Sequence, residues 1–157
     1  CGIAIPNGTE MIYYDRVQTD WPLQINLQVG SHTPSWCTAS GKLYLSSLPK
    51  QRRLKIINLL PMEQYTRNTI TDTRTLEAEL QRIKKTEVGT DNEEFCDGMV
   101  ACAVPVLDSS GKLLACLFTH APVIRKSLDE LLGYLPILRQ AADELGRLID
   151  DPDDDQP

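Results

Sequence analysis

The sequence predicts an α+β domain in which an antiparallel sheet is flanked by helices. Segments with strand-like patterns lie at the start of the chain and again between residues 99 and 120. Segments with helical patterns lie between residues 38 and 86 and after residue 127. Runs of strands that are separated from runs of helices are typical of α+β folds, whereas regular alternation would indicate a parallel sheet.

Three strands are expected first. The segments "CGIAI" and "EMIYYDRV" flank Asn7-Gly8, a dipeptide that favours a tight hairpin turn. Apolar and polar residues alternate from Leu23 to Val29, as in a strand with one buried face. The "GSHTPSW" segment that follows is rich in Gly, Ser and Pro, which predicts a loop.

Three helices are expected next, because each segment has a start signal. The segment "CTASGKLYLSSL" is expected to become helical after Thr38, a suitable N-cap, with the small residues Ala39, Ser40 and Gly41 in its first turn. Pro49 suits the first position of a second helix. Asp72 is a suitable N-cap for a third helix. One face of this third helix is apolar, with Leu76, Leu80 and Ile83.

The chain then returns to strands and ends in a helix. "MVACAVPVL" and "KLLACLFTH" flank the turn signal "DSSG", which predicts a hairpin with Pro105 at an edge or bulge. Ser127 and Glu130 form a capping-box pattern before a helix with apolar residues at helical spacing from Leu128 to Ile149. Pro136 is expected to kink or split this helix.

Composition limits the classes of function. The 157 residues have a net charge of −6, and five aspartates lie between Asp150 and Asp155. We expect a domain over residues 1–150 and a disordered acidic tail over 151–157. The remaining body is close to neutral, which argues against a DNA-binding surface. The basic cluster "KQRRLK" is interpreted as a solvated helix face. No apolar run approaches the roughly 18 residues that a membrane span needs.

The cysteines and histidines form no recognisable site. The five cysteines have no paired spacing, so free and mostly buried thiols are expected. The spacing of these residues with His32 and His120 matches no zinc pattern. Cys37, His120 and Asp91 could form a catalytic trio, but no local nucleophile motif supports it. A thiol or metal sensor that uses Cys37, Cys96 or Cys116, and a small cysteine hydrolase, are the alternatives that remain open.

Strand parity indicates a pocket instead. In the second hairpin strand Phe118 and His120 share one face with Cys116. In its partner strand Ala101 and Cys102 lie on opposite faces. A face that continues from Phe118 to His120 is unusual for a pure core, although a histidine at a strand end could simply contact solvent.

Three further segments stand out, and they are "EMIYYDRV", "GSHTPSWCTASGK" and "NTITDTRTLEAELQRIKK". Together with the stretch from Asp91 to Asp108, they resemble segments of the C-terminal domain of the IclR family of bacterial transcription regulators. Glu87 stands where members usually have Gly, and Leu107 where they have an aromatic residue or His. Ala101 stands where many have Cys, and Cys102 where an aliphatic residue is usual. The family signature reads here, in order, Asp91, Glu94, Ala101, Cys102, Ala103, Val106 and Asp108.

The resemblance implies a GAF-like effector-binding domain that performs no chemistry and needs no metal or cofactor. The effector would be an organic acid or an aromatic catabolite. An N-terminal winged helix-turn-helix domain, outside this chain that starts at Cys1, would bind operator DNA. A cytoplasmic, membrane-independent dimer or tetramer is expected. Carried over by position, the pocket wall would consist of Ala39, Ser40, Asp91, Met99, Ala101, Phe118 and His120, with Leu23 or Ile25 on the apolar side.

Overall fold

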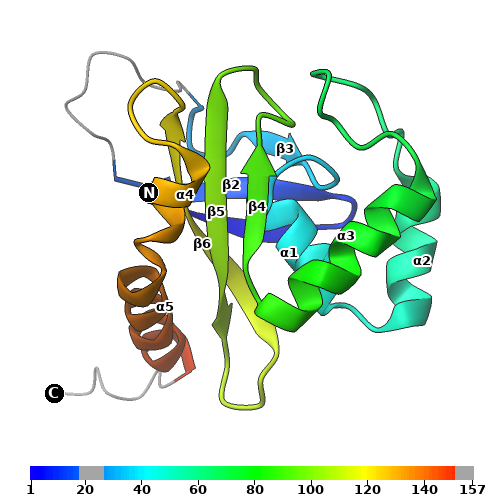
Figure 1. Ribbon diagram of the computed structural model, residues 1–157. Coiled ribbons are helices and arrows are strands. Elements are labelled where there is room, and N and C mark those ends of the chain that lie inside the picture. Colours follow the sequence, from blue (N-terminus) through cyan, green and yellow to red (C-terminus); the bar gives the residue numbers. More distant parts are fainter. Residues whose placement is uncertain (18–26, 151–157) are drawn as a thin grey trace, which may run out of the picture.

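A six-stranded antiparallel sheet in the order β3-β2-β1-β6-β5-β4 lies at the centre of the computed structural model (Figure 1). The structure describes residues 1–17 and 27–150. The strands of the described part are β1 (Gly2–Asn7), β2 (Glu10–Arg16), β3 (His32–Pro34), β4 (Gly89–Asn92), β5 (Met99–Leu107) and β6 (Leu113–Pro122). The predicted α+β class with an antiparallel sheet is confirmed.

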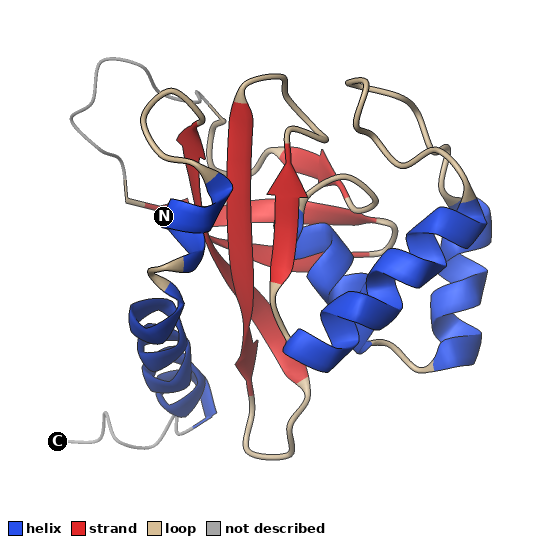
Figure 2. Cartoon of the chain, in the orientation of Figure 1, coloured by secondary structure: helices blue, strands red, loops and turns tan. Residues whose placement is uncertain are grey.

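Helices cover both faces of this sheet, as Figure 2 shows. The described helices are α1 (Ala39–Ser47), α2 (Lys50–Leu59), α3 (Thr73–Thr86), α4 (Leu128–Leu132) and α5 (Leu135–Asp150). Helix α1 packs on β4, β5 and β6, and α3 packs on the outer side of α1. Helices α4 and α5 lie on the opposite face of the sheet.

Strand parity divides the interior into two apolar cores. Val100, Cys102 and Val104 of β5 are buried against α4 and α5. Ala103, on the other face, belongs to the core beneath α1, which also contains Cys116 and Phe118. Cys102 is therefore a core residue on the face away from α1, as its parity with Ala101 predicted.

Three of the four predicted helix starts are confirmed. Thr38 and Asp72 accept hydrogen bonds from Gly41 N and Thr75 N, and Ser127 forms a capping box with Glu130. The C-terminal helix is split ahead of Pro136, between α4 and α5. Pro49 is the N-cap of α2 rather than its first helical residue.

Two short edge strands were not predicted. His32–Pro34, expected as a loop, pairs with β2, and Gly89–Asn92 pairs with β5. Both have few strand-forming residues, so pairing with a longer neighbour decides their conformation. Pro34 is tolerated because an edge strand does not need every N–H group.

Three expectations need correction. The strand predicted from Leu23 to Val29 lies mainly outside the described residues, and its described part, residues 27–29, forms a loop and turn instead. The turn closes through a hydrogen bond from Ser31 N to Gln28 O. Arg53, expected on a solvated face, is buried, because its guanidinium forms a bidentate ion pair with Glu77. Ile149 is 52% exposed at the end of α5 rather than packed.

Within the described ranges, no helix combines the length and the apolar character that crossing a bilayer requires.

Candidate functional site

The candidate site is a cavity between the start of α1 and the sheet, and its floor is a row of paired residues. Asp91 of β4 pairs with Ala101 of β5, and Ala101 pairs with His120 of β6. Residues that are paired across strands point to the same face, so the three side chains lie side by side. Because Ala101 is small, the floor is open between the carboxyl group and the imidazole.

The first turn of α1 forms the opposite wall and lies close to the sheet. A Cβ atom at Gly89 would lie 2.1 Å from the carbonyl oxygen of Ala39, so only glycine permits this approach. Thr38 also anchors the turn, since its hydroxyl donates to Pro34 O at 2.7 Å and accepts from Gly41 N at 3.1 Å. Ala39 and Ser40 therefore face the floor across a narrow gap.

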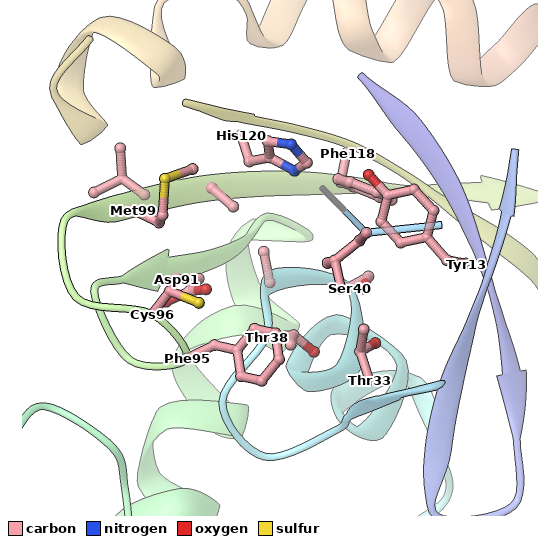
Figure 3. Close-up of a pocket in the computed structure, with 14 residues that line it drawn as sticks. Tyr13, Thr33, Thr38, Ser40, Asp91, Phe95, Cys96, Met99, Phe118 and His120 are labelled. Atoms are coloured by element: carbon pink, nitrogen blue, oxygen red, sulfur yellow. The ribbon is translucent and has the colours of Figure 1, made fainter. Parts of the chain in front are cut away.

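The cavity, which is partly open to solvent, has a volume of about 150 Å³. A cavity of this size can hold a molecule as large as benzene. Figure 3 shows His120, Tyr13 and Ser40 on one side, with Asp91, Cys96 and Met99 on the other. The lining consists of Tyr13, Leu27, Thr33, Thr38, Ala39, Ser40, Asp91, Phe95, Cys96, Met99, Val100, Ala101, Phe118 and His120.

The structure brings together all of the predicted site residues that it describes. The seven that line the cavity are Ala39, Ser40, Asp91, Met99, Ala101, Phe118 and His120. The other two, Leu23 and Ile25, lie outside the described residues. Leu27, from the same alternating segment, lines the cavity.

Sequence reasoning missed most of the aromatic wall. Tyr13 of β2 packs edge-on against Phe118 with the ring centroids 5.0 Å apart, and Phe95 follows the acidic motif. Alternation along β2 could have placed Tyr13 on an inward face with Met11, but not opposite a particular helix. No local pattern marks Phe95, since it enters the cavity through the loop between β4 and β5.

Asp91 is the acidic group of the cavity, and it is nearly buried at 6% exposure. Its Oδ1 accepts a hydrogen bond from Glu94 N at 2.8 Å. Burial raises the pKa of Asp91 to about 7, because desolvation outweighs this hydrogen bond and the attraction of Lys42. The neutral and ionised forms of Asp91 are therefore both populated near neutral pH.

Lys42 lies behind Asp91 in a buried ion network. Its side chain is fully buried, and Nζ donates to Glu79 Oε1 at 3.1 Å and to Glu94 Oε1 at 2.9 Å. Glu94 Oε2 lies 2.8 Å from the same ammonium group without a hydrogen bond of its own. Arg82 also pairs with Glu79, at 2.7 Å. The network supports the acidic loop but offers no charge to the cavity.

His120 is a neutral polar group at the other end of the floor. Its ring stacks on Phe118 with the centroids 5.7 Å apart and an interplanar angle of 28°. Burial, together with nearby positive charge from Arg16, lowers the pKa of His120 to about 4. The neutral imidazole has one donor and one acceptor nitrogen for a ligand.

The geometry gives little support to the thiol alternatives. Burial raises the pKa of Cys37, and the charges of Asp91 and Glu94 raise it further. Burial also raises the pKa values of Cys96 and Cys116. A thiolate is the reactive form of cysteine, so these environments work against nucleophilic or redox chemistry. In the part of the chain that the structure describes, no three His, Cys, Asp or Glu side chains are grouped to hold a metal ion.

Solved structures of domains from transcription regulators share this fold. The inducer-binding domain of the transcription factor PobR from Acinetobacter, a double mutant in complex with 3-hydroxybenzoic acid, matches with a TM-score of 0.87. The match has 28% identity and covers 94% of this chain and 87% of that chain. The C-terminal domain of the E. coli regulator KdgR matches with a TM-score of 0.78 and 27% identity, over 93% and 84% of the two chains. Fold and cavity thus define an effector-binding domain of a bacterial transcription regulator.

Sequence comparisons identify the family. The family model for the bacterial transcriptional regulator IclR C-terminal domain matches residues 1–147. The chain is 40% identical to "Probable transcriptional regulator SauR" from Cupriavidus necator, over 92% of this chain and 58% of that protein. It is 32% identical to the p-hydroxybenzoate hydroxylase transcriptional activator of Acinetobacter baylyi, over 82% and 50%. The chain belongs to the IclR family, and it spans between half and three-fifths of the length of these relatives.

Proposed function

We propose that this domain senses a small metabolite, an organic acid or an aromatic catabolite, and controls the operator binding of a longer regulator. The DNA-binding part would be an N-terminal winged helix-turn-helix domain outside this chain. The domain would also associate with itself, as a dimer or tetramer, and would act in the cytoplasm, where the operator lies. No catalysis is required for this role.

The observation that carries the proposal is a cavity between α1 and the sheet with polar groups that are available to a ligand. Asp91 and His120 lie at its two ends, and Tyr13, Phe95 and Phe118 supply aromatic walls. Ligand sites typically combine an apolar lining with a few convergent polar groups. The matching PobR domain holds 3-hydroxybenzoic acid, an aromatic acid of similar size to the cavity.

The position of the cavity suggests how binding could be transmitted. Its walls come from both sides of one packing contact, between the first turn of α1 and strands β4, β5 and β6. A ligand that fits better when α1 is close to the sheet would favour that arrangement over a more open one. Such differential affinity is what shifts a conformational equilibrium, and it would alter how paired DNA-binding domains meet an operator.

A thermal-shift screen of small acids and aromatic compounds tests the proposal. A ligand at a hundred times its dissociation constant should stabilise the domain by roughly 2.7 kcal/mol. Asp91→Ala and His120→Ala should weaken binding of the hit while the unliganded variants stay folded. His32→Ala is the matched control, because His32 is exposed and pairs with Glu10. Unchanged binding by both cavity variants would show that the site is elsewhere.

A further inference from the structure

The charge balance of the cavity carries information about its ligand. The described lining has one carboxyl group, that of Asp91, and no ammonium or guanidinium group. Lys42 is the nearest cation behind this carboxyl, and its ammonium group is bound to Glu79 and Glu94. An ionised Asp91 would therefore leave the cavity with uncompensated negative charge.

The polar groups opposite Asp91 are suited to oxygen acceptors. Tyr13 is 4% and Ser40 is 7% exposed, and within the described residues neither hydroxyl forms a hydrogen bond. The half-buried imidazole of His120 also borders the cavity. The three polar groups are therefore accessible from the cavity and available to bind polar atoms of a ligand. Each can donate to a carboxylate or a similar oxyanion.

We propose that the cavity binds a small acid as its anion together with one proton, and that Asp91 carries this proton. The inference rests on the proposed sensing function and specifies the ligand class and the protonation state of that site. A protonated Asp91 offers a hydrogen-bond donor and no charge, whereas an ionised Asp91 repels the anion across the small Ala101. Asp91 keeps Oδ1 engaged with Glu94 N, so the remaining oxygen is available for the proton.

The surroundings of Asp91 make this proton available near neutral pH. Burial raises its pKa to about 7, and an anion placed beside it would raise the pKa further. Lys42 and the backbone N–H groups of Glu94 and Phe95 favour the ionised form of Asp91, but burial and the charge of Glu94 outweigh them. The titratable and charged groups around Asp91 are Cys37 before α1, Lys42 in α1, Glu79 in α3, Glu94 and Cys96 in the β4–β5 loop, and His120 in β6.

The proposal makes the affinity for an anion dependent on pH. If only the protonated form of Asp91 accepts the anion, affinity should fall about tenfold between pH 6 and pH 8, since the titration is centred near pH 7. A neutral ligand should lose much less. In Asp91→Asn the side chain is neutral at both values of pH, so its affinity for an anion should be nearly the same at each.

Calorimetric titration with benzoate, benzamide and benzamidine tests this directly, because the three probes share a shape and differ in charge. The expected result is that benzoate binds more tightly at pH 6 than at pH 8 by about tenfold, and that Asp91→Asn removes this dependence. The folded state of the variant is checked by thermal unfolding at each pH.

The contrary outcomes are distinct from a failure of the sensing function. Benzoate affinity that is flat or rises with pH, or a preference for benzamidine, would overturn the proposal. A pH dependence that persists in Asp91→Asn would also overturn it. So would the absence of benzoate binding at millimolar concentration, and the sensing function would still stand if the wider screen produced a cavity ligand. Only an empty screen would count against the sensing function itself.

Discussion

Asp91→Asn should stabilise the unliganded domain, and should do so more strongly as pH rises. The native state keeps the Asp91 proton up to a pKa of about 7, whereas the unfolded chain releases it near 3.8. The native state therefore binds more protons than the unfolded state between these values, and wild-type stability from this group is lost as pH rises through 7. Asparagine preserves the shape and the acceptor for Glu94 N without a charge to desolvate.

The magnitude follows from the two pKa values. Each pKa unit corresponds to about 1.4 kcal/mol, so burial of ionised Asp91 costs the native state on the order of 4 kcal/mol above pH 7. At pH 5 most of this cost is absent, because the native carboxyl is still protonated. The advantage of Asp91→Asn over wild type should thus be larger at pH 8 than at pH 5 by about 2.5 kcal/mol.

Urea denaturation of both proteins at pH 5 and pH 8 measures this difference. At pH 8 the urea midpoint of Asp91→Asn should lie above that of the wild type. The slope m should be the same for both proteins, since the surface exposed on unfolding is unchanged. The contribution of His120 to stability has the opposite pH dependence. Its native pKa of about 4 lies below the ordinary value of 6.5, so the native state binds fewer protons than the unfolded state and stability falls as pH falls from 6.5 toward 4. This contribution is shared by both proteins and cancels in the comparison. An equal effect of the substitution at both values of pH would refute the reasoning.

Three further predictions concern the frame of the cavity. Lys42→Met should destabilise the domain by about 3 to 5 kcal/mol in urea denaturation, because it leaves the buried Glu94 without its cation; a loss below 1 kcal/mol would contradict a tight network. Gly89→Ala and Gly146→Ala should each cost about 1 to 3 kcal/mol, since both introduce a Cβ within 2.4 Å of a backbone oxygen. Only Gly89→Ala, beneath α1, should also weaken ligand binding in the thermal-shift assay, and equal effects of both would argue against the role of α1. Glu87→Gly should raise the unfolding free energy by about 1 kcal/mol, because Glu87 caps α3 at a φ of 55°, and a decrease would show that its side chain matters more than its backbone strain.

The conformation of Glu87 bears on a departure from the family pattern. Members usually have Gly where this chain has Glu87, and the structure places this residue in the left-handed region at the end of α3. Glycine adopts that conformation without a steric penalty. Glu87 adopts this conformation with a full side chain, so the fold accommodates it at a local cost.

Local signals were sufficient to predict most of the fold. The N-caps Thr38, Asp72 and Ser127 act through hydrogen bonds to residues three positions ahead, so short motifs reveal them. The β5–β6 hairpin depends on a turn of adjacent residues, and Pro136 lies in the first turn of α5, directly after the break that follows α4. Each of these features is decided within about one helical turn or one hairpin.

Features that depend on distant pairing could not be predicted in this way. The strands β3 and β4 exist because β2 and β5 offer them hydrogen bonds, not because their own residues favour extended structure. Tyr13 lines the cavity because α1 folds back over the sheet, which no pattern within β2 indicates. The family resemblance located seven lining residues because it carries this nonlocal information by position.

Filling the cavity is the most direct test of the central claim, that a small molecule binds between α1 and the sheet. Ala101→Leu adds three carbon atoms to the floor between Asp91 and His120 without removing a polar group. Ala141→Leu, on the opposite side of the sheet, is the matched control. We predict that a ligand found by the screen loses all measurable calorimetric binding to Ala101→Leu and keeps its affinity for Ala141→Leu. Full binding to a folded Ala101→Leu protein would contradict the account.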